Sequence, residues 1–377
     1  MFPKVQVNAL NLLSGPTKEI ERTALFVGVG TTNLNQLLTV TADSDLDKLL
    51  GRGESPLKSQ LKAAKLNAGQ NWFAYAYVMD QDSFDFVRAV REANKNGSFE
   101  YCVNTHTLGV DKAKLNALQS LYAELLAEYG RRTFFIQAID GINNDTSTGE
   151  TWANYVTKLE NLQKTVVADH VMLVPNLFGN DVGVLAGRLA NRAVTVADSP
   201  ARVRTGAVVE LGAAEKPKDK DGVSLDLSHL QALERARYST VMWYPDYDGY
   251  YWSDGRTLDA EGGDFQAIEN VRVVDKVARR IRLLAVSKIA DRSFNSTLAS
   301  TEAHKTFFAQ PLREMSKAVQ IGTEFFPGEC FPPSEDAIEI VWRNRNQVEI
   351  YINVRPVDCP KEITVNIFLD LKTLGGE

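Results

Sequence analysis

The stretch PLKSQLKAAKLNAGQNWFAYAYVM (56–79) joins a helix pattern directly to a strand pattern. Pro56 stands at a first-turn position, where its missing N–H costs nothing, and Gly69 is a typical residue just past a helix end. The segment 72–79 is aromatic and apolar throughout, as expected for a strand that is buried on both faces. These signals predict a helix over 56–68 that leads into a central strand of a buried sheet.

The same alternation of helix and strand patterns extends on both sides of this stretch, from residue 23 to about residue 210. Further strands are expected at 23–30, 101–104, 133–140 and 170–176, and further helices at 43–50, 83–95, 111–130, 150–164 and 180–193. Because short links join these elements, the pattern is typical of an α/β layer with a largely parallel or mixed sheet.

The alternation stops after this region. The charged segment EKPKDKDG (215–222) is the best candidate for a linker between domains. The segment TVMWYPDYDGYYWSDGRT (240–257) predicts a strand–turn–strand unit, with turn signals at the Asp-Gly pairs 248–249 and 254–255. The chain therefore combines the α/β layer with a second region of different character.

The last third of the chain predicts long helices followed by strands. Two long helical stretches are expected at 264–290 and 295–320. The segments VEIYINV (348–354) and EITVNIFLDL (362–371) then alternate apolar and polar residues strictly. We expect these two segments to form a β-hairpin with one buried face. The fold class predicted for the whole chain is α+β or α/β, a mixed-sheet α/β body followed by a region with long helices and a terminal β-hairpin.

The composition excludes several classes of protein. The chain has 377 residues, of which 44% are hydrophobic and 24% charged, as in ordinary globular proteins. Lys plus Arg number 42 and Asp plus Glu number 48, so the formal net charge is −6. An acidic chain is not a general nucleic-acid coat, because phosphate binding needs a basic field. We expect no signal peptide and no membrane helix, and we expect the three cysteines to be free thiols in a reducing cytoplasm.

No motif of the chain predicts a catalytic residue, a cofactor or a metal site. GVGTTN (28–33) follows a strand, but Asn33 stands where a dinucleotide-binding turn needs its third glycine, so an ordinary turn is favoured. Asp43, Asp45 and Asp47 lack the rest of a calcium loop and are better explained by a helix N-cap with acidic first-turn residues.

The segment 243–254 concentrates six aromatic residues and three aspartates. Stacking rings beside carboxylates suit recognition of a sugar, and they equally suit a hairpin that packs into a core or a subunit interface. We favour packing.

The segment 267–288 is an electrostatic exception within the acidic chain. It carries six positive and two negative side chains, a local charge of +4. Arg272, Lys276, Arg279 and Arg280 recur at spacings that place them on one helix face. Residues alone leave open whether this face is merely solvated or docks an acidic partner.

Taken in order, four segments resemble the tail sheath proteins of contractile phage tails, as a divergent and short member of that family. The segments are 10–30 (an arm and a first strand), 46–78 (helix, Ser-Pro-Leu helix start, Asn-Ala-Gly and strand), 249–282 (aromatic strand, Gly-Arg-Thr turn and helix) and 362–371 (a closing arm). The order of these patterns over most of the chain carries the resemblance.

The resemblance implies a domain order and a function. It implies an N-terminal arm (1–20), an α/β outer domain (21–238), a C-terminal assembly and tube-proximal domain (239–360) and a C-terminal arm (361–377). It also implies a structural subunit, not an enzyme, that polymerises as stacked hexameric rings around an inner tube. Contraction of this sheath drives the tube through the host envelope.

The resemblance further implies partners and interface residues. The expected partners are other copies of this chain, the inner tail tube protein, and the baseplate and tail terminator proteins, with no nucleic acid and no membrane. The expected location is the virion tail, after assembly in the host bacterial cytoplasm. The expected tube-facing residues are Arg272, Lys276, Arg279 and Arg280, and the expected inter-subunit arm strands include Val5, Val7, Ile363, Val365, Ile367 and Leu369. The alternatives left open are an α/β enzyme and a carbohydrate-binding module that uses the aromatic segment 240–257.

Overall fold

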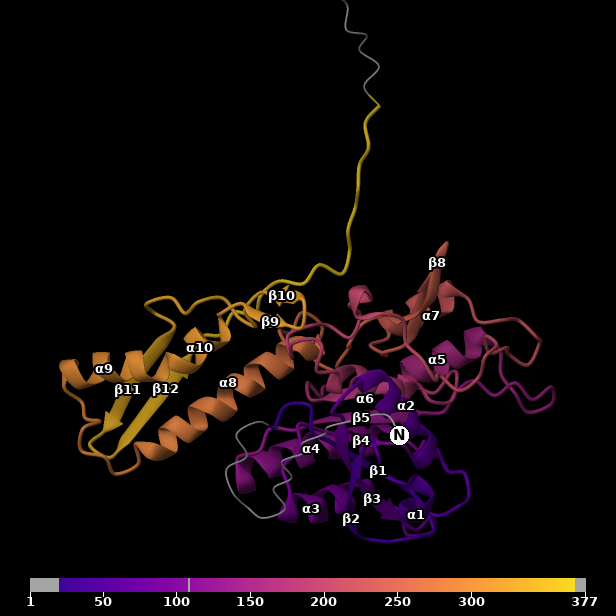
Figure 1. Ribbon diagram of the computed structural model, residues 1–377, viewed down its shortest axis with the longest axis horizontal. Helices are drawn as coiled ribbons and strands as arrows, with labels where there is room; N and C mark the ends of the chain where they lie inside the picture. The colour runs from indigo at the N-terminus through magenta and orange to yellow at the C-terminus, as the bar shows by residue number, and fades with distance from the viewer. Residues whose placement is uncertain (1–19, 108, 370–377) are drawn as a thin grey trace, which may run out of the picture.

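The computed structural model describes residues 20–107 and 109–369 and has two parts, which Figure 1 shows side by side. We call the larger part, built around a six-stranded sheet, the body. We call the smaller part, built from helices and short strands after residue 272, the C-terminal lobe. A long helix, α8 (Ile268–Ser287), runs from one to the other.

The sheet of the body has the strand order β2-β3-β1-β4-β5-β6. Its strands are β1 (Ala24–Val29), β2 (Leu37–Thr41), β3 (Phe73–Met79), β4 (Tyr101–Asn104), β5 (Phe134–Ile139) and β6 (Val171–Pro175). All neighbouring pairs are parallel except β2 and β3, which are antiparallel. The sheet is therefore mixed, as the alternation of patterns predicted, and its central strands are buried on both faces because helices cover both sides.

Most helices of the body begin just after a residue whose side chain accepts a backbone N–H of the first turn. They are α1 (Leu46–Leu50), α2 (Pro56–Ala68), α3 (Phe86–Asn96), α4 (Lys112–Tyr129), α5 (Trp152–Gln163), α6 (Asp181–Ala190) and α7 (Leu227–Arg235). The Ser55 side chain accepts the Lys58 backbone N–H at the start of α2, and Asp45 caps α1 in the same way. Strand β2 and helix α7 had no clear sequence signal.

The charged segment 215–222 is not a linker, contrary to the sequence-based expectation. The Asp219 carboxylate accepts the backbone N–H of Trp152 at the start of α5 (3.3 Å), and Lys220 N–H donates to the Glu150 carbonyl (3.2 Å). The chain then continues into α7, which packs against α5. The segment is a surface loop of the body, because the hydrogen bonds of Asp219 and Lys220 hold its middle against the start of α5.

The aromatic segment forms a hairpin of β7 (Val241–Tyr244) and β8 (Tyr247–Trp252), as expected, but its turn lies elsewhere. The two residues between the strands are Pro245 and Asp246, and Asp246 takes a positive φ of 60°. Aspartate tolerates this conformation better than most residues. The predicted turn at 248–249 is wrong, since both residues lie within β8.

The C-terminal lobe is built on the second half of α8. It contains α9 (Leu298–Phe308), α10 (Gln310–Met315), β9 (Val319–Ile321), β10 (Glu324–Phe326), β11 (Ile338–Asn344) and β12 (Gln347–Ile352). The single helix expected over 295–320 is in fact two, because Pro311 stands in the first turn of α10 and cannot donate a hydrogen bond to the end of α9.

The expected pairing of 348–354 with 362–371 is wrong. Strand β12 pairs with the preceding strand β11, with Ile338 opposite Ile352 and Ile340 opposite Ile350. Only two residues separate β11 from β12, which favours a tight hairpin, whereas Pro356 and Pro360 interrupt the chain after β12 and cannot donate to a ladder. Residues 362–369, the described part of the second segment, form no strand.

Two hydrophobic clusters share α8. The cluster of the body extends from β1 to Ile268 and Val271 at the start of the helix. The cluster of the lobe begins with Val273 and joins Phe308 and Ile338. No helix within 20–107 or 109–369 is long and apolar enough to cross a membrane.

Candidate functional site

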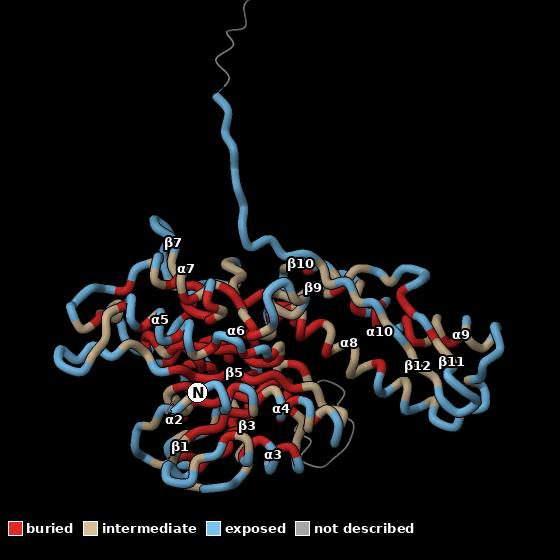
Figure 2. Tube along the Cα trace, turned by 180° about the vertical axis from the view of Figure 1, so that it is seen from behind, coloured by how far each residue is buried: buried red, intermediate tan, exposed pale blue. Residues whose placement is uncertain are grey.

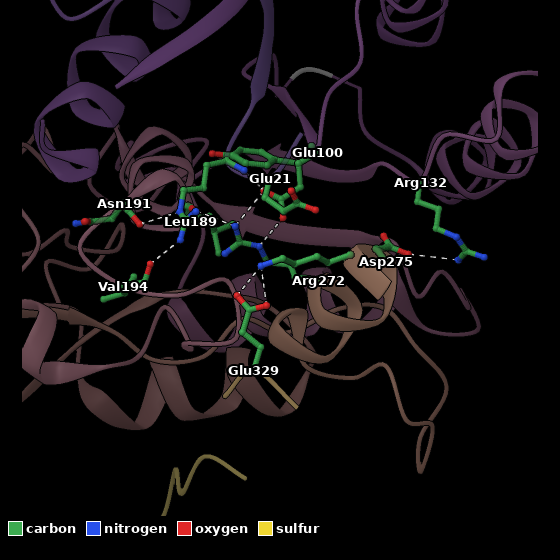
Figure 3. A network of polar contacts seen from close by, with 12 residues as sticks. Glu21, Glu100, Arg132, Leu189, Asn191, Val194, Arg272, Asp275 and Glu329 are labelled. Atoms are coloured by element: carbon green, nitrogen blue, oxygen red, sulfur yellow. Dashed lines mark hydrogen bonds and ion pairs between the residues drawn. The ribbon is translucent and has the colours of Figure 1, made fainter. Parts of the chain in front are cut away.

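The first candidate surface is the basic face of α8. Its first residue, Arg272, is buried in the protein, and Figure 3 shows the polar contacts around it. Its guanidinium makes two hydrogen bonds to the Glu100 carboxylate (2.8 and 3.0 Å) and a third to the Leu189 carbonyl (3.0 Å). The side chains of Arg272 and Glu100 are 2% and 1% exposed. Burial disfavours the ionised carboxyl of Glu100, but Arg272 outweighs this effect and lowers the pKa of Glu100 below its usual value.

Two more cations of this face also bind carboxylates of their own chain. Lys276 Nζ lies 2.6 Å from a Glu329 carboxylate oxygen, and Arg279 donates to Glu21 (2.9 Å). Arg280 differs, because its side chain is 39% exposed and lies 3.8 Å from Glu314. Three of the four predicted tube-facing residues are therefore engaged within the chain. Helical spacing alone could not reveal this, because their partners are distant in the sequence.

A second buried cluster, missed by the sequence analysis, joins α8 to β6. His170 Nδ1 lies 2.8 Å from Asp169, and its Nε2 lies 3.4 Å from Asp275 on α8. The imidazole stacks on the ring of Tyr122 (3.7 Å between centroids), and Arg132 pairs with Asp275 at 3.3 Å. Burial opposes the charged imidazole, but the two carboxylates prevail and raise the pKa of His170 to about 9. In the sequence, only the neighbouring residues Asp169 and His170 could have pointed to this cluster, because the other members are distant in the chain.

The second candidate surface is the C-terminal arm. Ile363, Val365, Ile367 and Leu369 are 76, 74, 89 and 81% exposed. Their segment is extended and leaves the rest of the protein, as Figure 2 shows. Val5 and Val7, the residues expected in the N-terminal arm, lie outside the described residues.

Lys361 marks the root of this arm. Its ammonium binds Asp254, just after β8, and Glu269 in the first turn of α8 (2.7 Å). The two carboxylate side chains are 12% and 8% exposed, so the lysine offsets one of two largely buried negative charges. The arm is therefore attached to the body at residue 361 and is exposed over residues 362–369.

The aromatic hairpin divides into a packed base and an exposed tip. Trp252 is fully buried, and Tyr250 contacts Phe178 and Trp243 edge-on. At the tip, Tyr244 and Tyr247 are 39% and 56% exposed. Of the six rings, those of Tyr251 and Trp252 are buried, and those of Trp243 and Tyr250 pack against the core while partly exposed, which agrees with the packing interpretation.

The described residues hold no group of three or more His, Cys, Asp or Glu side chains that could bind a metal ion. A hollow of about 800 Å³ lies where β1, β4 and β5 end, which is the usual ligand crevice of such sheets. Its lining includes Glu54, His106 and Asp140, and the lining that the structure describes contains no lysine or arginine.

Comparison with protein families gives two matches that together span nearly the whole chain. The family model described as "DUF2586, N-terminal domain" matches residues 2–256, and "DUF2586, C-terminal domain" matches residues 264–372. A "Putative tail sheath protein" of Haemophilus phage HP1 (strain HP1c1) is 68% identical over 375 residues, which cover both chains completely.

Two solved structures share the fold at low sequence identity. A chain of the anti-feeding prophage baseplate, determined by cryo-EM with six-fold symmetrisation, has 13% identity and a TM-score of 0.58, with 98% of this chain and 99% of that chain covered. A sheath tail protein from Desulfitobacterium hafniense has 10% identity and a TM-score of 0.54, with 93% and 97% covered.

Proposed function

This chain belongs to the DUF2586 family and is a structural protein of a phage tail sheath, and from that premise we propose how it assembles and acts. Copies of the chain polymerise in the host bacterial cytoplasm as stacked hexameric rings around an inner tail tube. The finished sheath meets a baseplate at one end and a terminator protein at the other. Its contraction drives the tube through the host envelope.

The observation that carries this proposal is the exposed arm 362–369. Ile363, Val365, Ile367 and Leu369 stand at every second position of an extended segment that has no partner strand among the described residues, and Phe368 adds a fifth exposed apolar side chain. Leaving such a segment in water is costly and invites aggregation, so it is a liability in a monomer. It is useful in a polymer, because it can add a strand to the sheet of a neighbouring copy.

The acceptor in this proposal is the β11–β12 hairpin of the neighbouring copy. Within the described residues this sheet has two strands, so each strand has an unpaired edge. Two-stranded sheets are marginally stable, and added strands would satisfy the edge N–H and C=O groups. The N-terminal arm with Val5 and Val7 is proposed to supply a further strand in the same manner.

We expect substitution of Ile363, Val365, Ile367 and Leu369 by serine to abolish polymerisation and leave the chain folded. The reason is that the structure shows these side chains exposed and apart from the core. Sedimentation velocity and negative-stain microscopy measure assembly, and circular dichroism checks folding. The matched control replaces Thr364 and Asn366, the alternate residues of the same segment, by serine. Normal cylinders formed by the fourfold variant would refute the proposal for this arm.

Contraction is proposed to move each copy as a rigid unit. The buried ion pairs of Arg272 and Arg279 link α8 to the body, and the lobe is built on the same helix. Bistable assemblies commonly move by rigid-body rotation about short hinges. The residues after Lys361 would serve as the hinge of the C-terminal arm.

Contact with the inner tube through the basic face of α8 stays a prediction, and the structure sharpens its test. Replacing Arg272 by glutamate would place its carboxylate against that of Glu100 in the interior. Loss of assembly could then reflect misfolding of the subunit. Arg280 is the suitable position, because its side chain is 39% exposed. We expect Arg280→Glu to reduce cosedimentation with the tube several-fold, more strongly at low salt.

The control for this experiment is Arg91→Glu on α3, where the side chain is 49% exposed and also faces a glutamate. Equal tube binding by wild type and Arg280→Glu would show that Arg280 does not contact the tube.

A further inference from the structure

Two short hairpins stand on the side of the molecule from which the arm leaves. Figures 1 and 2, which are opposite views, both show β7–β8 and β9–β10 on this side, with the arm rising between them. Helix α3 lies on the opposite side in both views. We call the side with the two hairpins the arm face.

Lys361 fixes the place where the arm leaves this face. Its ammonium is held between Asp254, two residues after β8, and Glu269 at the start of α8. Ile363, the first apolar residue of the proposed strand, comes two residues after Lys361 and so lies within about 7 Å of it, at roughly 3.3–3.6 Å per residue. A copy whose sheet edge receives this strand must therefore lie close to the arm face.

The tip of β7–β8 presents tyrosine rings that are already ordered. The rings of Tyr244, Tyr247 and Tyr251 lie 5.6 to 6.3 Å apart between centroids. Tyr251 is 5% exposed and its hydroxyl donates to the Asp248 carbonyl, whereas Tyr247 is 56% exposed. Binding through such a cluster costs little ordering entropy, and tyrosine is enriched among the residues that dominate interface energies.

Hairpin β9–β10 presents a second exposed aromatic ring. Phe325 is 76% exposed, although its neighbour Phe326 is buried beneath the Arg202 guanidinium, 5.0 Å from the ring centroid. Arg202 and Arg204 both bind Glu324 of the same strand, at 2.7 and 2.9 Å. The hairpin is thereby fastened to the body while the Phe325 ring stays in solvent.

We propose that Tyr247 and Phe325 are contact residues for a second copy of this chain, the copy that receives the C-terminal arm. The inference rests on the proposed function. Once the arm is inserted, its short span holds the acceptor next to the arm face at high effective concentration. Two large aromatic side chains on ordered hairpins are then suited to bury against that acceptor.

Photo-crosslinking of assembled sheaths tests this proposal. The crosslinking amino acid p-benzoylphenylalanine is placed singly at Tyr247, Phe325, Ile367 or Lys95, where Ile367 reports on the arm and Lys95, 56% exposed on α3, is the control. We expect dimers of this chain from Tyr247, Phe325 and Ile367, with yields several-fold above Lys95. Dimers from Ile367 without dimers from Tyr247 and Phe325 would overturn the inference and leave the arm proposal standing. Absence of dimers at all three positions would overturn both.

A binding measurement provides the second readout. The double variant Tyr247→Ser, Phe325→Ser should raise the concentration needed for polymerisation at least tenfold, with an unchanged circular dichroism spectrum. The control Lys95→Ser should polymerise as wild type. Saturable binding of an oligosaccharide, lost in Tyr247→Ser, together with unchanged polymerisation would assign the β7–β8 tip to a carbohydrate instead.

Discussion

The charged residues at the junction of body and lobe form ion pairs with residues that are distant in the sequence. Arg272 binds Glu100 and Arg279 binds Glu21. Removing one member of a buried pair leaves an uncompensated charge, so each pair makes the orientation of α8 costly to change. The main role of these residues is therefore to fix the orientation of α8 within the subunit.

His170 makes a pH-dependent contribution to stability. Its pKa in the folded protein is about 9, above the value of about 6.5 expected in the unfolded chain. The resulting stabilisation is fully present below about pH 6.5 and is lost as the pH rises through about 9. We expect His170→Asn to reduce the free energy of unfolding by about 3 kcal/mol more at pH 6 than at pH 10.

Urea denaturation of wild type and His170→Asn at both pH values measures this difference. Loss of the stacking on Tyr122 lowers stability equally at both pH values, so the comparison isolates the charge. A destabilisation independent of pH would show that the folded protein holds the imidazole neutral.

At the scale of elements, helices α2 and α6 pack against each other at very short range. A Cβ atom on Gly183 would lie 2.2 Å from the Gln60 carbonyl oxygen, and one on Gly187 would lie 2.4 Å from the Ala64 carbonyl oxygen. The Gln60 side chain also receives the Gly183 N–H and donates to the Gly179 carbonyl. The two helices touch backbone to backbone because α6 has glycine at these positions.

We expect Gly183→Ala to destabilise the protein. Overpacking costs about 1 to 3 kcal/mol, which exceeds the gain of roughly 0.5 to 1 kcal/mol from replacing a glycine within a helix. Gly53→Ala is the control, because nothing lies within 4 Å of the added Cβ. Thermal melts of both variants measure the difference, and an unchanged melting temperature for Gly183→Ala would mean that α2 and α6 can separate freely.

Elements with local start and stop signals were predicted well. The helix expected over 56–68 is α2, and the strand expected at 101–104 is β4. Errors arose where the choice of partner mattered, since the alternating segment at 362–371 carries a strand pattern but pairs with nothing in 362–369. Alternation shows that a segment can form a strand, whereas pairing depends on which edge is within reach.

At the scale of the whole molecule, α8 makes the two parts interdependent. Its first residues, Ile268 and Val271, complete the core of the body, and Val273 begins the core of the lobe. The boundary proposed between residues 238 and 239 stays a prediction. The C-terminal family match begins at residue 264 and so includes all of α8. In the structure, however, the start of α8 packs in the core of the body.

We expect a fragment of residues 1–262 to be much less stable than a fragment of residues 1–290. The shorter fragment loses Ile268 and Val271 from the core, and Glu100 loses its ion pair with Arg272. Loss of the two apolar side chains alone removes about 3 to 6 kcal/mol of burial free energy, at roughly 1.5 to 3 kcal/mol for each. Urea midpoints of the two fragments measure the effect, and equal midpoints would show that the body is complete without α8.

Most of the order of helices and strands in the body, the mixed α/β class and the resemblance to tail sheath proteins could be reached from the sequence, because they rest on local periodicity and on the succession of segments. The burial and ion pairing of the basic residues of α8 could not be predicted from the sequence. Helical spacing places Arg272 and Arg280 on one side of a helix, but burial depends on what packs there, and Glu100 arrives from 172 residues away. Ion pairing, strand pairing and exposure are properties of contacts between distant segments, so they emerge when the chain is folded.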